Sequence, residues 1–111
     1  MTSTSSFATA SAYSTEVEGD APVLLRMRIE GAIGSDYLRF VMDRAQWLGL
    51  AGWARGTRSG QVEIVAAGPE ALVGALEMAC VLGPLDTLVE ALHTETADEI
   101  VPNGFVLLAQ K

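Results

Sequence analysis

The segment LRMRIEGAIG, residues 25–34, decides the fold, because apolar and charged residues alternate through its first six positions before glycines break the pattern. Leu25, Met27 and Ile29 fall on one side of the alternation, and charged residues fall on the other. A period of two is typical of a β-strand with one face on a core and one face in water. The segment therefore predicts a half-buried strand that ends at Gly31.

The residues after this strand predict a helix. Apolar side chains recur at steps of three and four from Tyr37 to Leu48, which places them on one helix face. Ser35 or Asp36 stands where a helix N-cap is favoured, and Gly49 stands where a helix ends. The chain is thus expected to pass from a strand, through a short loop, into the first turn of a helix.

The rest of the chain repeats these two patterns. Strands are predicted over residues 50–56, 61–67, 87–95 and 104–109, and a second helix opens at Gly68-Pro69-Glu70 and ends at Gly83-Pro84. The apolar positions of this helix predict one buried stripe, made of Leu72, Ala75, Leu76, Ala79, Cys80 and Leu82. The order β-α-β-β-α-β with an extra terminal strand predicts an α+β, ferredoxin-like sandwich.

In this sandwich an antiparallel sheet of four to five strands carries both helices on one face. Two helices cover only one face, so the other face is expected to be solvated. Its charged side chains would form a cross-strand lattice of Arg26, Arg28, Glu30 and Glu63.

Composition limits the domain count and the class of partner. The chain has 111 residues, enough for one domain; the Ser-, Thr- and Ala-rich residues 1–21 predict a disordered tail before a domain over residues 22–111. Fourteen acidic residues against seven basic ones give a formal charge of −7, which argues against nucleic acid as a partner. No apolar stretch is long enough for a membrane and no signal peptide is evident, so we expect a cytoplasmic protein.

Cysteine and histidine usage argues against a metal or cofactor site. Cys80 is the one cysteine and lies in an apolar run, so it predicts a buried, unreactive thiol. His93 is the one histidine and has no partners in the sequence for a metal cluster or a catalytic triad. We therefore expect neither a metal nor a cofactor.

Four segments together resemble a known family. The segment LGLAGWAR, residues 48–55, resembles the LGLxGWVxN signature of the acylphosphatases. Further segments are similar to motifs of that family in the same order: GQVE at 60–63 with AGPE at 67–70, Gly83-Pro84 with Leu88-Val89, and NGF at 103–105. The resemblance spans about residues 23–110 and implies a ferredoxin-like domain that hydrolyses acyl phosphates to a carboxylate and phosphate.

The resemblance also implies a mechanism without a metal, a cofactor or a covalent intermediate. In that family a loop after the first strand, with the pattern VQGVxFR, wraps a phosphate with backbone N–H groups. Its arginine clamps two phosphate oxygens, and an asparagine at the end of the second strand holds the attacking water. A helix N-terminus and a guanidinium both favour a bound phosphate. The resemblance places the anion-binding loop at Ile33, Gly34, Ser35, Asp36 and Tyr37.

This loop is one residue shorter than the family's, so two registers compete for the clamp. Counting back along the helix from Leu48 places Leu38 at the arginine position, whereas counting forward from Gly31 places Arg39 there. We favour the helix register, because a gap inside a helix rotates every later residue by about 100°. In that register the clamp is lost and Arg39 pairs with Asp43 on the surface. In the other register Arg39 remains the catalytic cation.

Two further departures do not depend on the register. Gly56 falls at the position of the water-holding asparagine and has no side chain. Asp36 is expected to cap the helix, take N–H groups that a phosphate needs, and repel the anion. Arg55 falls at a variable family position and is expected on the surface. Whether the domain is an enzyme therefore stays open: it is either a weak hydrolase that binds an acyl phosphate or another small anion, or a non-catalytic protein-interaction or small-ligand module.

Overall fold

Two helices and five strands follow one another in the predicted order in the computed structural model, which describes residues 21–110. The elements are β1 (Pro22–Ala32), α1 (Tyr37–Trp47), β2 (Ala51–Gly56), β3 (Val62–Pro69), α2 (Glu70–Leu82), β4 (Leu88–Thr96) and β5 (Phe105–Leu107). The tail predicted over residues 1–21 falls, except for Ala21, outside the described residues.

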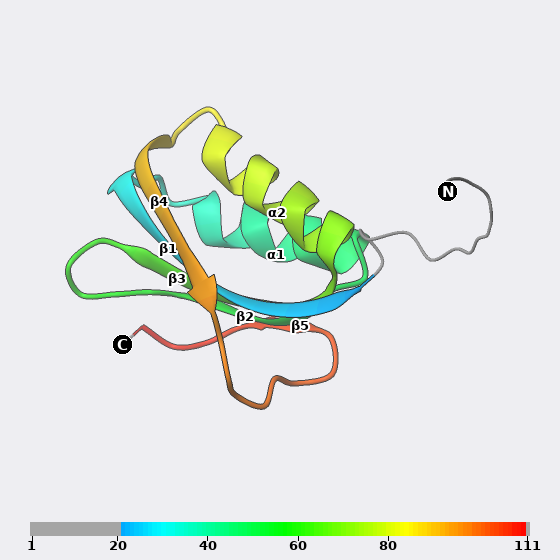
Figure 1. The fold of residues 1–111 in the computed structure, drawn as a ribbon. Helices are drawn as coiled ribbons and strands as arrows, with labels where there is room; N and C mark the ends of the chain where they lie inside the picture. Colours follow the sequence, from blue (N-terminus) through cyan, green and yellow to red (C-terminus); the bar gives the residue numbers. More distant parts are fainter. Residues whose placement is uncertain (1–20, 111) are drawn as a thin grey trace, which may run out of the picture.

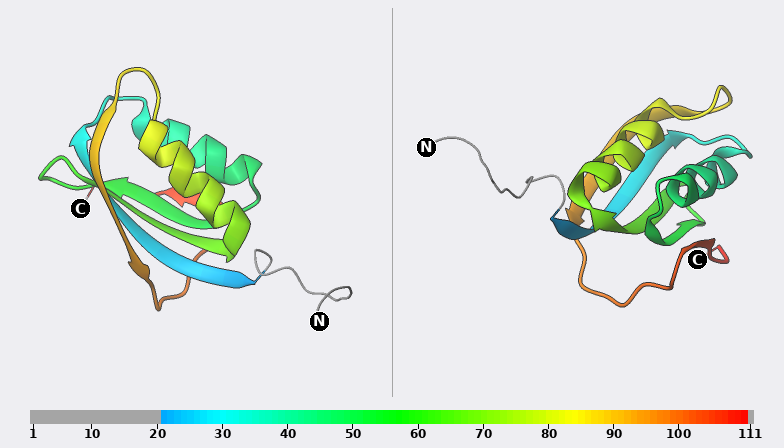
Figure 2. Two further views of the ribbon diagram at one scale, coloured as in Figure 1. Left: turned by 45° about the horizontal axis from the view of Figure 1, so that its top comes forward. Right: turned by 90° about the vertical axis from the view of Figure 1, so that its right-hand side faces the viewer.

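The strands form one sheet in the order β4-β1-β3-β2-β5. Neighbouring strands run antiparallel, except that β5 runs parallel to β2. Both helices lie on the same face of this sheet, side by side, as the views in Figure 1 and Figure 2 show. The predicted α+β, ferredoxin-like architecture is confirmed.

The core lies between the helices and the sheet. The alternation in β1 turns Met27 and Ile29 inward, where both are completely buried, as predicted. The helices meet them with Val41 from α1 and Leu76 from α2, which are also completely buried. Burying each large aliphatic side chain stabilises the fold by about 1.5–3 kcal/mol, so this layer fixes how α1 sits on the sheet.

The opposite face of the sheet is not fully solvated, contrary to the prediction. The segment between β4 and β5 passes across it (Figure 1), and Ala97 of that segment packs with Trp53 and Val65. Glu99 holds the segment in place, since it pairs with Arg26 and accepts a hydrogen bond from Trp53 Nε1 at 3.3 Å. Because β4 and β5 lie at opposite edges of the sheet, the segment that joins them has to cross one face of it. On this face the segment forms a small second core with the sheet.

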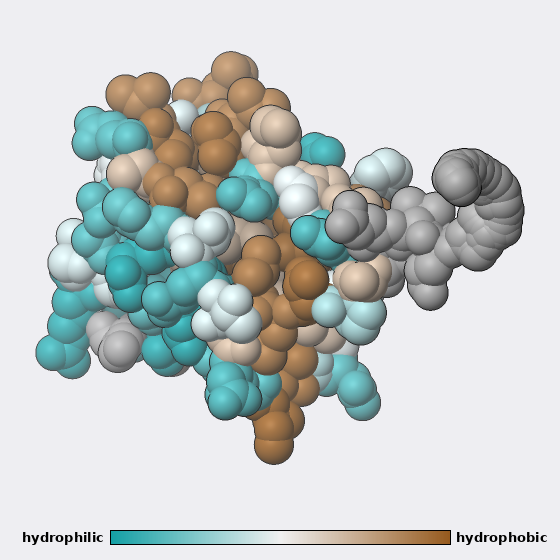
Figure 3. All heavy atoms as spheres, viewed as in Figure 1, coloured by the Kyte–Doolittle hydropathy of each residue, from teal (hydrophilic) through white to brown (hydrophobic). Residues whose placement is uncertain are grey.

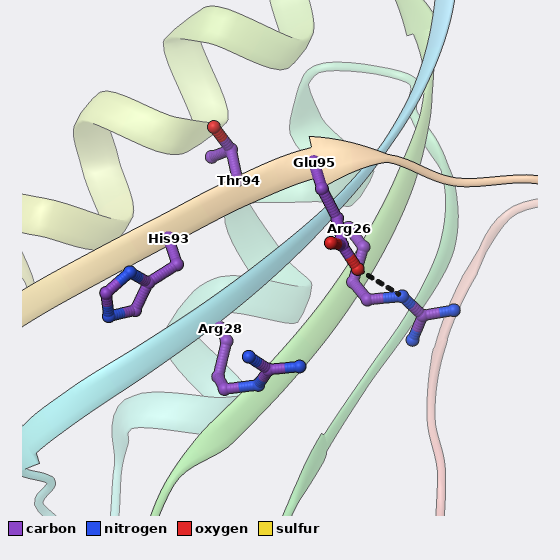
Figure 4. A pocket seen from close by; sticks show the side chains of 5 residues that line it. All are labelled: Arg26, Arg28, His93, Thr94 and Glu95. Carbon is purple, nitrogen blue, oxygen red and sulfur yellow. Dashed lines mark ion pairs between the residues drawn. The ribbon is translucent and has the colours of Figure 1, made fainter.

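Charged residues on this face pair differently from the predicted lattice. The Arg55 guanidinium lies 4.8 Å from the Trp53 ring centre, and its Nε lies 3.1 Å from Oε1 of Glu63, which is only 8% exposed. Arg55 was predicted at the surface, and its side chain is only 24% exposed because of these two contacts. Figure 4 shows Arg26 and Arg28 projecting from β1 on this side, with Arg26 Nε 3.7 Å from Oε2 of Glu95.

The buried side of α2 also differs from the prediction. Val73, Leu76 and Cys80 face the core, whereas Leu72 and Leu82 of the predicted stripe are exposed. Apolar residues occur all around α2, so the periodicity alone could not select the correct side. None of the helices within residues 21–110 is long and apolar enough to span a membrane.

Candidate functional site

The loop over residues 33–36 joins β1 to α1, and a bulge in β1 directs the chain into it. The pairing of β1 with β4 shifts register between Glu30 and Gly31. Gly31 has a φ of 153°, and a Cβ there would overlap the carbonyl oxygen of Leu88, so glycine alone fits. The bulge therefore sets the direction in which the loop approaches the first turn of α1.

A groove of about 280 Å³ lies between this loop and the β2–β3 hairpin. The residues of the predicted site that line it are Ile33, Gly34, Ser35, Leu38 and Gly56. Gln110 closes one side and donates a hydrogen bond from Nε2 to the carbonyl of Thr57 at 3.2 Å. No charged side chain is among the described residues that line the groove.

Leu38 and Gly56 approach each other in this groove. A Cβ built at Gly56 would lie 3.9 Å from Cδ1 of Leu38, with no other atom of a non-neighbouring residue within 4 Å. Position 56 therefore has room for a side chain, and that side chain would contact the Cδ1 methyl group of Leu38.

Arg39 lies outside the groove. Its side chain is 75% exposed, and its Nε lies 3.9 Å from Oδ1 of Asp43, one helical turn further on. The structure thus brings Leu38, and not Arg39, to the loop and the end of β2.

The prediction that Asp36 caps α1 with its carboxylate was wrong. Asp36 stands at the N-cap position, but its side chain makes no capping hydrogen bond, because its backbone lies in the helical region, with φ −92° and ψ −2°. Its N–H instead points toward Oδ2 of Asp86 at 3.4 Å, and the N–H of Gly34 donates to Oγ1 of Thr87 at 2.9 Å. Two N–H groups of the loop therefore face side chains from the α2–β4 connection.

Asp86 lies directly against the loop. A Cβ at Gly34 would overlap the Asp86 carboxylate, so a side chain at that position would displace the carboxylate from the loop. Thr87 Oγ1 also donates to Oδ1 of Asp86 at 3.2 Å. The sequence interpretation missed Asp86 and Thr87. Because β1 and β4 are antiparallel neighbours, the loop that leaves β1 and the turn that enters β4 meet at one end of the sheet.

Tyr37 belongs to the core and not to an anion site. Its side chain is completely buried, and its hydroxyl donates to the carbonyl of Cys80 at 2.7 Å, which links α1 to α2. Its N–H donates to the carbonyl of Gly34 at 3.3 Å and is not free for a ligand. Burial raises the pKa of the Tyr37 hydroxyl well above its ordinary value, and burial raises the pKa of the Cys80 thiol to about 12.

Within residues 21–110, no three His, Cys, Asp or Glu side chains gather in a metal-binding arrangement. His93 lies on the open side of the sheet (Figure 4), where its Nε2 is 3.6 Å from Oε2 of Glu30. The groove is lined by residues of the β1–α1 loop, the first turn of α1 and the end of β2.

Known proteins resemble this chain over nearly the whole of the described domain. The family model for acylphosphatase matches residues 25–107. The acylphosphatase of Rhodopseudomonas palustris is 35% identical over 82 residues, which cover 73% of this chain and 83% of that protein. The acylphosphatase of Rhodospirillum rubrum is 42% identical over 70 residues, which cover 62% and 77% of the two chains.

Solved structures agree with these matches. The acylphosphatase from Bacillus subtilis superposes with a TM-score of 0.72 at 25% identity, covering 78% of this chain and 98% of that one. An acylphosphatase from Coxiella burnetii gives a TM-score of 0.74 at 23% identity, covering 78% and 93%, and supports the fold. The matched range contains the loop over residues 33–36, Leu38 and Gly56. This chain belongs to the acylphosphatase family.

Proposed function

We propose that this domain hydrolyses acyl phosphates to carboxylate and phosphate only weakly or not at all. The observation that carries the proposal is the pair Leu38 and Gly56, which meet in the groove where the family chemistry needs a guanidinium and a water-holding amide. A methyl group cannot neutralise a phosphate, and glycine has no group to orient water. Removing a single preorganised donor from an active site costs about 2.7–4 kcal/mol of transition-state stabilisation, so two such losses bring turnover close to background.

Electrostatics favour the same conclusion. The described residues that line the groove carry no charge, and the whole chain carries −7, so the overall field of the protein does not favour an anion. Asp86 adds a carboxylate beside the loop, and its Oδ2 faces the N–H of Asp36. A phosphate approaching the loop would therefore meet like charge, together with N–H groups at residues 34 and 36 that already have partners.

Hydrolysis of benzoyl phosphate tests the proposal directly. The natural chain at about 50 µM is expected to hydrolyse it at close to the buffer rate, whereas Leu38→Arg with Gly56→Asn is expected to raise the rate at least 100-fold. The asparagine is tolerable because position 56 has free space and Gly56 is not among the glycines with positive φ.

The matched control is Leu38→Gln with Gly56→Asn, which adds polarity without the cation and should stay near the buffer rate. Efficient hydrolysis by the natural chain that Arg39→Ala abolishes would overturn the proposal, because Arg39 would then be the clamp.

The second candidate function is a non-catalytic module that binds a small ligand or a protein. The uncharged groove favours it, since about 280 Å³ with hydroxyl and amide groups from Ser35, Thr57 and Gln61 suits a small neutral ligand better than an anion. A titration with inorganic phosphate, followed by amide chemical shifts, separates the candidates. Saturable shifts at residues 33–37 would favour retained anion binding, and their absence up to about 20 mM, a weak-binding limit, would favour the module.

A further inference from the structure

The side of α2 that faces away from the sheet carries no charged residue. Helical geometry places six exposed residues opposite the buried Val73, Leu76 and Cys80. We call them the outward face of α2: Ala71, Gly74, Ala75, Met78, Val81 and Leu82. A helix that is apolar on the side opposite its core face is normally covered on that side as well.

The exposed apolar surface is large for a small domain. Met78 is 63% exposed, Leu82 is 74% exposed, and Leu85 in the following turn is fully exposed. Figure 3 shows apolar residues gathered where α2 and that turn lie. Val81 is 46% exposed and Leu88, at the start of β4, is 64% exposed, so the exposed apolar residues here are grouped and not singly scattered.

We propose that a second copy of this chain covers the outward face of α2, with the two α2 helices packed antiparallel about a twofold axis. The distribution of side-chain size on this face supports that occupant, because small residues lie toward the start of the helix and large ones toward its end. An axis between Leu76 and Glu77 sets Leu82 of one copy against Ala71 of the other, and Met78 against Ala75. Met78 and Leu82 then each meet an alanine, which lets the helices approach closely.

Charge also favours α2 over the rest of the surface. Two copies that each carry −7 repel one another, and the repulsion is least where the contacting faces are uncharged. Glu70 and Glu77 are the charged residues of α2, and both lie to one side of the outward face. A membrane surface is a poorer occupant, because interfacial helices use Lys and Arg beside the apolar face and α2 has none.

The oligomeric state of the full chain tests the proposal. Sedimentation velocity between about 1 and 200 µM should show a rise from the mass of one chain to that of two, as expected for a weak to moderate dimer. Met78→Glu and Ala75→Glu, both at exposed helical positions, should each raise the dissociation constant at least tenfold. The matched control is Trp47→Glu, which makes the same change at an 81% exposed apolar residue of α1 and should leave the dissociation constant unchanged.

Disulfide trapping tests the antiparallel orientation. A mixture of Ala71→Cys and Leu82→Cys chains should form the mixed disulfide, whereas neither variant alone should form a disulfide-linked dimer. Cys80 is completely buried and does not interfere. A chain that stays monomeric at 200 µM would overturn the proposal, as would a dimer that Met78→Glu does not weaken; benzoyl phosphate turnover plays no part in either result.

Discussion

The two helices rest on the same sheet and differ on the side that faces away from it. Toward the core they are alike, since each buries three residues completely, Tyr37, Val41 and Ala45 in α1 and Val73, Leu76 and Cys80 in α2. Away from the core, α1 presents Arg39, Asp43 and Arg44 to solvent, whereas α2 presents alanines and Met78. Water solvates the charged side chains of α1 favourably. The apolar side chains of α2 are more stable when another protein surface covers them.

The largest difference in unfolding free energy is expected between truncations of a leucine on the buried side and a leucine on the outward side of α2. Leu76→Ala should lower the free energy of unfolding by about 2–5 kcal/mol, because it opens a cavity at a completely buried position. Leu82→Ala should change it by less than about 0.5 kcal/mol, since that side chain is already 74% exposed. Both are measured by urea denaturation in the Met78→Glu background, so that self-association does not contribute. Equal losses would mean that Leu82 is covered within the monomer.

The same difference between the helices explains what the sequence could predict. In α1, charged residues separate the apolar ones, so the spacing from Tyr37 to Leu48 identified the buried side. In α2 nearly every residue is apolar, and the predicted stripe was rotated toward Leu72 and Leu82. Hydrophobic periodicity locates a face only where polar residues mark the opposite one.

The site shows a second limit of sequence reasoning. The placement of Leu38 in the groove and Arg39 outside it agrees with the register counted along the helix, since helical geometry is rigid. The contact of Asp86 with the loop could not be read in that way, because it joins residues about 50 positions apart through the pairing of β1 with β4. Local spacing carries information about one element, and contacts between loops depend on the whole sheet.

The buried groups shared by the helices predict a loss of stability at alkaline pH. The pKa of Cys80 rises to about 12 on folding, chiefly because burial disfavours the thiolate, and the pKa of Tyr37 rises for the same first reason. Their stabilisation is complete below the unfolded-state pKa values, near 9 for the thiol and near 10 for the tyrosine hydroxyl, and is lost above them, because the unfolded chain ionises first. We expect a loss of about 2 kcal/mol between pH 9 and 10.5, measured by urea denaturation. Cys80→Ala should flatten this slope, and an unchanged slope in that variant would contradict the assignment.

The hydrogen bond between the helices should have a smaller effect. Tyr37→Phe removes the hydroxyl that donates to the carbonyl of Cys80 and leaves that buried carbonyl without this partner. The free energy of unfolding should fall by about 1–2 kcal/mol, with little change in the amide shifts of the sheet. Phe40→Leu on the same helix is a suitable control, because Phe40 is only partly buried and makes no such bond between the helices. A loss no larger than the control's would mean that water replaces the hydroxyl.

The smallest effect is expected on the outward side of α1, and it bears on the proposed function. Arg39 and Asp43 form an exposed pair at i, i+4, a geometry worth about 0.3–0.5 kcal/mol and weakened by salt. A double-mutant cycle with Arg39→Ala and Asp43→Ala should return that coupling at low ionic strength and nearly none in 0.5 M sodium chloride. Neither variant should alter the response of residues 33–37 to phosphate, because the Arg39 side chain points away from the loop. If Arg39→Ala instead removed phosphate-induced shifts there, Arg39 would reach the loop in solution, and the outward side of α1 would belong to the site rather than to solvent.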